Sequence, residues 1–176
     1  MAGFDVPKPR VVCILGPTAV GKTEAALELA GRYGGEIVSA DSMQVYRYMN
    51  IGTAKPTPEE RSRVFHHLID VADPDEPFDV ARYIGMARGV VSALHREGKP
   101  VFIVGGTGLY IRALLGGLID GPGADEELRR ELKQEMKVRG KAHLYERLKA
   151  RDPRAADRIN PGDGIRIIRA LEVIEN

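Results

Sequence analysis

The sequence lacks the features of a secreted or membrane-spanning protein. It contains a single cysteine, Cys13, so no disulfide can form within one chain. No hydrophobic run approaches the length of a membrane span, and residues 1–5 carry neither the basic nor the apolar region of a signal peptide. We therefore expect a cytoplasmic protein that does not enter a membrane.

Metal-ligand clusters are also scarce. His66 and His67 are adjacent, so in a strand they point to opposite faces and on a helix they diverge, which is poor geometry for a shared metal ion. No aspartate follows the apolar run at 101–104, where phosphate-binding enzymes often carry a second carboxylate. The sequence predicts no metal site made by protein ligands alone.

The net charge of +1 gives no reason by itself to expect a nucleic-acid partner, but the charge is unevenly distributed. Residues 1–128 hold 13 Lys and Arg against 17 Asp and Glu, whereas residues 129–169 hold 13 against 6. The second segment is helical by pattern, so its arginines can form a face that suits an RNA backbone. A solvated helical surface of mixed charge explains the same count equally well.

A phosphate-binding loop is the most informative motif that is present. It lies between an apolar run at 10–15 and a helical pattern at 23–33, where the backbone N–H groups and the helix N-terminus can hold a phosphate. Lys22 adds a full positive charge, and the Thr23 hydroxyl is placed to ligate Mg²⁺. The loop consists of Gly16, Pro17, Thr18, Ala19, Val20, Gly21, Lys22 and Thr23.

Strand and helix patterns alternate through the first two thirds of the chain. Strands are predicted at 10–15, 36–40 and 101–104, with a helix from Val80 to about residue 97 that Asp79 can cap. This order predicts an α/β fold, a P-loop NTPase-like parallel sheet flanked by helices. After Gly121-Pro122-Gly123 the pattern is helical, so we expect a core at 1–120 and a basic helical appendage at 121–176.

A second candidate site follows the strand at 36–40. Its carboxyl end delivers Asp41-Ser42-Met43-Gln44, and residues 51–56 follow soon after. Ligands of parallel sheets bind at the carboxyl ends of the strands, so Asp41 should face the same crevice as the phosphate loop. A carboxylate there can accept a proton, but kinases, hydrolases and diphosphate-displacing transferases could all use it.

Four separated blocks resemble the tRNA dimethylallyltransferases, and together they span nearly the whole chain. The blocks are GPTAVGKT at 16–23, SADSMQVY at 39–46 with IGTAKPTPEE at 51–60, VGGTGLY at 104–110, and IRIIRALEV at 165–173. Tyr48, Asn50 and Gly162 depart from the residues common in that family, without removing a catalytic group. Because members of the family continue beyond residue 176, we expect the chain to be an N-terminal fragment.

The resemblance implies a prenyltransferase that attaches a dimethylallyl group to the adenosine beside the tRNA anticodon and releases diphosphate. It implies Asp41 as the base that accepts the amine proton, Thr107 as a further catalytic residue, Mg²⁺ as cofactor, and tRNA and dimethylallyl diphosphate as partners of a monomer. The residues that it implies for tRNA binding are Asp41, Ser42, Met43, Gln44, Arg130, Ile165, Arg166, Ile167, Ile168 and Arg169.

Two alternatives remain open from the residues. One is a small-molecule kinase in which Asp41 activates a substrate hydroxyl for attack on ATP, although the IGTAKP block has no evident role in that chemistry. The other is a fragment that binds diphosphate without turnover.

Overall fold

The computed structural model describes residues 10–117 and 123–176, which form two compact units, Met1–Leu118 and Ile119–Asn176. Each unit has its own apolar core. The expectation for residues 1–5 and the Gly121-Pro122 part of the expected boundary lie outside the described residues.

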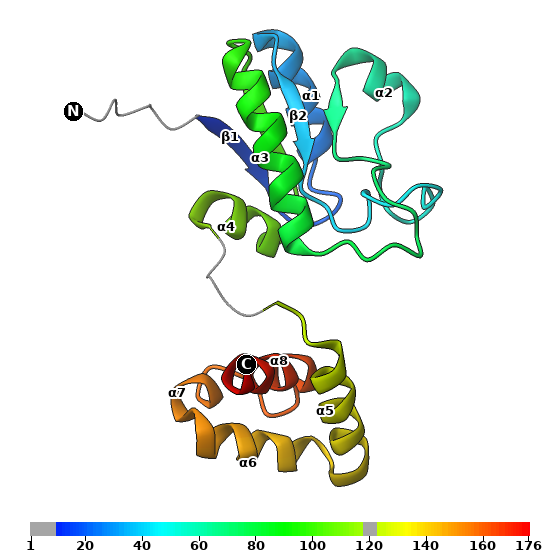
Figure 1. Cartoon of the computed structure of the whole chain (residues 1–176). Coiled ribbons are helices and arrows are strands. Elements are labelled where there is room, and N and C mark those ends of the chain that lie inside the picture. Colours follow the sequence, from blue (N-terminus) through cyan, green and yellow to red (C-terminus); the bar gives the residue numbers. More distant parts are fainter. Residues whose placement is uncertain (1–9, 118–122) are drawn as a thin grey trace, which may run out of the picture. The chain divides into compact units, whose positions relative to one another are not determined.

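A parallel sheet forms the centre of the first unit (Figure 1). Its order is β1 (Val11–Leu15), β4 (Val101–Gly105), β2 (Glu36–Ser39) and β3 (His66–His67). β1 and β2 follow one another in the chain, but β4 lies between them in the sheet. A crossover of this kind leaves a crevice at the carboxyl ends of these strands. The predicted P-loop NTPase-like α/β fold is confirmed.

Helices cover both faces of the sheet because the strand residues alternate between them. Val101 and Ile103 of β4 pack with α3 (Val80–Arg96) and α4 (Gly108–Gly116). Phe102 lies on the other face, in a cluster with Ala26, Leu27 and Ala30 of α1 (Lys22–Tyr33). The result is a three-layer unit whose carboxyl edge is left for loops.

Helix α3 follows its sequence signals closely. Asp79 accepts a hydrogen bond from the backbone N–H of Arg82 at 2.8 Å, as expected of an N-cap residue. The helix buries Tyr83, Ile84, Ala87, Val91 and Leu94. Val80, the first residue of the helix, is partly buried against the same core.

Two short elements and the edge position of one strand differ from the sequence-based expectation. Helix α2 (Pro58–Arg63), with Thr57 and Glu60 forming a capping box, and the two-residue β3 were not anticipated. The apolar run at 10–15 is typical of a buried strand, but among the described residues β1 pairs only with β4 and lies at the sheet edge. Val12 and Leu15 are consequently 47% and 49% exposed.

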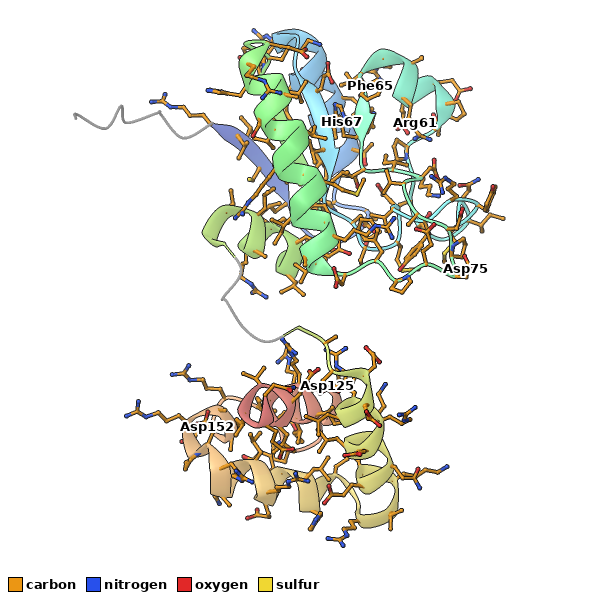
Figure 2. The ribbon with its side chains drawn as sticks, in the orientation of Figure 1. Arg61, Phe65, His67, Asp75, Asp125 and Asp152 are labelled. Carbon is orange, nitrogen blue, oxygen red and sulfur yellow. The ribbon has the colours of Figure 1, made fainter. Side chains whose placement is uncertain are left out.

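The second unit contains α5 (Glu126–Arg139), α6 (Lys141–Arg151), α7 (Pro153–Ala156) and α8 (Gly164–Glu175). Asp125 and Asp152, labelled in Figure 2, cap α5 and α7 through their side chains. Leucine and isoleucine side chains of α5, α6 and α8 form the core. None of the helices in the described ranges is both long and apolar enough to cross a membrane.

Glu172 is fully buried in this second core and is held by two arginines. Its carboxylate accepts from Arg129 at 2.9 Å, from Arg169 at 2.7 Å and from the backbone N–H of Asp125 at 2.7 Å. Burial acts to raise the pKa of Glu172, but these contacts outweigh it and hold the pKa below its ordinary value. These charged groups therefore link the start of α5 to the last turns of α8 within the second unit.

Candidate active site

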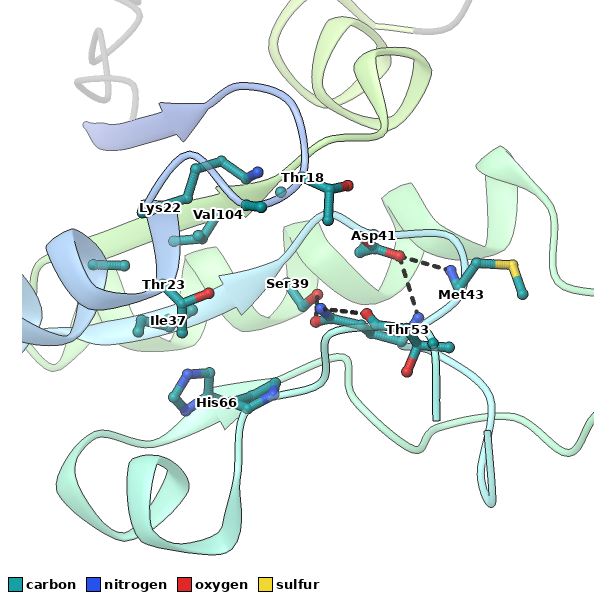
Figure 3. A pocket seen from close by; sticks show the side chains of 17 residues that line it. Thr18, Lys22, Thr23, Ile37, Ser39, Asp41, Met43, Thr53, His66 and Val104 are labelled. Atoms are coloured by element: carbon teal, nitrogen blue, oxygen red, sulfur yellow. Dashed lines mark hydrogen bonds between the residues drawn. The ribbon is translucent and has the colours of Figure 1, made fainter. Parts of the chain in front are cut away.

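Two hollows meet at the carboxyl edge of the sheet in the first unit. One, of about 390 Å³, is lined by the phosphate loop, Ser39, Gln44 and His66 (Figure 3). The other, of about 500 Å³, is lined by the other end of that loop, Ser42, Thr107 and Arg112. Their shared lining residues are Thr18, Asp41, Met43 and Gly105. A ligand in either hollow can therefore reach Asp41.

The phosphate loop has the backbone that its sequence predicts. Gly21 has φ of 86° immediately before α1, a conformation that disfavours any side chain. Thr23 and Lys22 both line the 390 Å³ hollow, and the Lys22 ammonium donates to the carbonyl of Pro17 at 2.5 Å. Val20, which is exposed, lines neither hollow.

Asp41 sits in a turn that uses only one of its carboxylate oxygens. Oδ1 accepts from the backbone N–H groups of Met43 at 2.9 Å and Gln44 at 3.3 Å. Within the described part of the chain, Oδ2 has no hydrogen-bond partner. The turn fixes the carboxylate and leaves one oxygen able to accept a proton from a ligand.

Thr107 clamps this turn to the end of β4. Its backbone N–H donates to the carbonyl of Ala40 at 3.0 Å, and its hydroxyl accepts from the Ser42 N–H at 3.0 Å. Gly105 makes the clamp possible, because a Cβ there would lie 2.2 Å from the Ala40 carbonyl oxygen. Thr107 also lines the 500 Å³ hollow, so it could contact a ligand as well as hold the turn.

Strained backbone is concentrated in the loops of this edge. The described non-glycine residues with positive φ are Ala19, Tyr48, Ala54, Leu68 and Asp70. All of them lie in connections that follow β1, β2 or β3. Such conformations persist where surrounding contacts hold them, and they are common at ligand sites.

His66 and Arg112 line the hollows and were not singled out as ligand residues from the sequence. His66 Nδ1 lies 2.8 Å from the Val64 carbonyl, which can only accept, so Nδ1 carries the hydrogen. Burial lowers the pKa of His66, which favours the neutral ring, whose Nε2 can accept a hydrogen bond. Arg112, exposed on α4, adds positive charge to the 500 Å³ hollow; its place two residues after VGGTGLY was the available signal.

The remaining expected tRNA contacts lie in the second unit. Arg130 and Arg166 have side chains that are 76% and 72% exposed, and Ile165 is also exposed. Arg169 is engaged with Glu172. Ile167 and Ile168 are buried in the helical core, so their side chains pack there and are not available to RNA. This corrects the expectation for these two side chains.

Two protein-family models match this chain. A model described as IPP transferase matches residues 44–176, and one described as isopentenyl transferase matches residues 9–70. The first match alone covers most of the chain.

Curated relatives agree with these family matches. The chain is 60% identical over 171 residues to a "tRNA dimethylallyltransferase 2" of Syntrophus aciditrophicus, covering 97% of this chain and 55% of that protein. It is 53% identical over 176 residues to a "tRNA dimethylallyltransferase" of Desulfosudis oleivorans, covering all of this chain and 56% of the relative. The chain spans about half the length of these relatives.

Solved structures are similar as well. A tRNA isopentenylpyrophosphate transferase from Bacillus halodurans is 47% identical with a TM-score of 0.63, over 96% of this chain and 56% of that one. A eukaryotic dimethylallyltransferase described as acting on tRNA is 31% identical with a TM-score of 0.77, over 93% and 40% of the two chains. On the family matches and these identities, the chain belongs to the IPP transferase family.

Proposed function

We propose that this chain carries the catalytic core of an enzyme that transfers a dimethylallyl group from dimethylallyl diphosphate to the exocyclic amine of the adenosine beside a tRNA anticodon. The names of the similar proteins support the substrate class. The observation that carries the proposal is the position of Asp41 on the wall shared by two hollows, one of which contains Lys22 and Thr23. The prenyl donor and the acceptor adenosine can thus both reach the carboxylate of Asp41.

The chemistry requires both a base and a good leaving group. The exocyclic amine of adenine is a weak nucleophile because its lone pair is delocalised into the ring. As the new C–N bond forms, the allylic C–O bond breaks and diphosphate leaves towards the phosphate loop, where Lys22 and the backbone N–H groups stabilise its charge. The amine proton passes to Oδ2 of Asp41, which conserves charge and atoms.

The residues fit Mg²⁺ as a cofactor shared with the diphosphate. In the described ranges, no group of three or more His, Cys, Asp or Glu side chains could hold a metal ion by itself. Mg²⁺ commonly takes one or two protein oxygens and completes its shell with phosphate oxygens and water, and the Thr23 hydroxyl lies in the hollow for this. When bound, Mg²⁺ would neutralise part of the charge on the departing diphosphate.

The target base must leave its stack in the anticodon loop to reach Asp41. Ser42 and Met43 line the hollow that would receive it, with Thr107 and Arg112 beside them. In the second unit, Arg130, Ile165, Arg166 and Arg169 are proposed to contact the RNA. A cytoplasmic monomer is part of the same proposal.

Incubation of the chain with dimethylallyl diphosphate, Mg²⁺ and an anticodon stem-loop RNA tests this function. Mass spectrometry should detect one added dimethylallyl group on the RNA, and none when the target adenosine is replaced by guanosine. A matched reaction with ATP and no prenyl donor serves as the control for phosphoryl transfer. Absence of the prenyl adduct in a protein that binds both substrates would contradict the proposal.

A further inference from the structure

The loop at residues 50–56, here called the wall loop, forms part of the 390 Å³ hollow. It contributes Gly52, Thr53 and Pro56, while Lys22 and Thr23 belong to the phosphate loop that lines the same hollow (Figure 3). The wall loop contains neither helix nor strand, and Ala54 within it has φ of 49°. Its shape must therefore come from side-chain contacts with its neighbours.

Gln44 makes the first of these contacts. Its Oε1 accepts from the Ser39 hydroxyl at 3.0 Å, and its Nε2 donates to the carbonyls of Thr53 at 3.2 Å and Ala54 at 2.9 Å. The amide thus links the end of β2 to the wall loop and uses both of its hydrogens. Since both amide hydrogens are engaged, this side chain has no remaining donor for the tRNA contact that the resemblance implied.

Lys55 makes the second contact from inside the wall loop. Its side chain is only 5% exposed, and its ammonium donates to the Tyr46 carbonyl at 2.5 Å, to Asn50 Oδ1 at 3.0 Å and to Asp70 Oδ1 at 2.7 Å. The other oxygen of Asp70 accepts from Arg61 at 2.9 Å. A buried ammonium is costly unless it is paired, so this network favours a single loop conformation.

We infer that Gln44 and Lys55 are positioning residues that hold the wall loop in place as one side of the diphosphate-binding hollow. Neither touches the reacting atoms; they act through Thr53, Gly52 and Pro56. The inference rests on the proposed function in one respect, because it takes the diphosphate of the donor as the ligand of this hollow. It gives the IGTAKP block a role that the sequence alone left open.

Gln44→Glu tests the inference with almost no change in size. At about pH 7.5 the carboxylate would face two carbonyl oxygens, so calorimetry should show Mg²⁺-diphosphate binding about tenfold weaker or more. The two carbonyl oxygens should raise the pKa of the introduced carboxyl, so that at about pH 5.5 its protonated form regains one donor and affinity relative to the wild type should recover. Lys22, Asp41 and His66 line the same hollow, and Lys55 and Asp70 lie beside it, so the wild type measured at each pH is the reference.

Asp70→Asn provides a second variant that keeps the side-chain volume. Hydrogen exchange at residues 50–55 should accelerate in both variants, while thermal unfolding reports whether the first unit remains folded. Lys149→Met, at an exposed lysine in the second unit, should change neither loop exchange nor binding.

Faster loop exchange with weaker binding that recovers at low pH in Gln44→Glu would support the inference. Unchanged affinity at every pH, or a loss without recovery, would overturn the positioning role while leaving the proposed function intact. If the wild type itself bound no diphosphate, the proposed function would fail instead, which keeps the two failures distinguishable.

Discussion

Asp41 combines a fixed orientation with an oxygen that has no partner in the described residues. Asp41→Asn preserves the bonds to the Met43 and Gln44 N–H groups, because an amide oxygen can replace Oδ1. It removes proton acceptance, so single-turnover prenyl transfer should fall by about a hundredfold or more while diphosphate affinity persists.

Asp75→Asn is the matched control for this prediction, since Asp75, labelled in Figure 2, is an exposed carboxylate that lines neither hollow. It should retain wild-type turnover. A fall of less than about tenfold in Asp41→Asn would exclude Asp41 as the base, because general base catalysis normally contributes more than that.

Lys22 and Thr23 should differ in how they affect ligand binding. Lys22→Ala removes a full charge and should weaken Mg²⁺-diphosphate binding by at least about tenfold. Thr23→Ala should also raise the Mg²⁺ concentration needed for half-maximal binding, because it removes a proposed metal oxygen. Titration calorimetry at several Mg²⁺ concentrations measures both effects, and unchanged isotherms for both variants would sink the phosphate-loop assignment.

The positions of residues that lie in one contiguous motif could be predicted from the sequence, whereas their roles stay predictions. The phosphate loop and Asp41 follow strands, and strand ends are predictable from apolar runs. Gln44, Lys55 and His66 were not assigned their structural roles. Their roles depend on partners such as Ser39, Thr53 and Asp70, and pairing between loops is not encoded in local spacing.

At the scale of elements, the close approach of β4 to the end of β2 leaves no room for a side chain at position 105. Gly105→Ala would place a methyl group against the Ala40 backbone, so we expect a loss of about 2 kcal/mol or more in the free energy of unfolding. Gly85→Ala lies within α3 with nothing near the added methyl, and should instead stabilise by roughly 0.5–1 kcal/mol. Denaturant unfolding of the pair measures both; equal effects would contradict the packing argument.

The Glu172 cluster predicts acid sensitivity of the second unit. The pKa of Glu172 is lower in the folded state than its ordinary value of 4.5, so its stabilising contribution is complete above that pH. The contribution should be lost as the pH falls through the folded-state pKa. Circular dichroism melts should therefore show a stability decline below about pH 4.5.

Glu172→Gln should unfold more easily at neutral pH, because Arg129 and Arg169 lose their shared counter-charge. It should also flatten the decline in acid, and Glu146→Gln, at an exposed position of α6, provides the comparison. An equally steep acid decline in Glu172→Gln would show that other carboxylates govern the transition.

Long elements were more predictable than short ones. α3 was found because its cap, Asp79, and a long helical pattern agree. β3 has only two residues and no apolar run, and it exists because His66 and His67 pair with Ile37 and Val38. The edge position of β1 was also missed, because strand order is set by crossovers rather than by strand composition.

At the scale of the whole molecule, net positive charge resides in one part of the chain. Residues 129–169 carry 13 basic against 6 acidic groups, but several arginines are engaged inside the second unit. Arg130 and Arg166 are the exposed candidates for phosphate contacts. Replacing either by Ala should weaken stem-loop RNA binding and reduce the slope of log K against log salt by about one.

Arg32→Ala, on α1 of the first unit, is the control for these two variants. Arg169→Ala is less informative because it would also uncover the buried carboxylate of Glu172. Salt-titrated filter binding decides the question: identical slopes in the wild type, both variants and the control would mean that this basic surface does not contact RNA.

The hydrogen bond from the Lys22 ammonium to the Pro17 carbonyl should affect which anions the phosphate loop binds. The ammonium already has an acceptor within its own loop, so an incoming anion must displace that carbonyl, and binding becomes an exchange of partners. A singly charged ion such as chloride or acetate gains little from the exchange, whereas a diphosphate brings several charges and can also bridge the backbone N–H groups. The phosphate loop should therefore bind common monovalent anions weakly and polyphosphates more tightly.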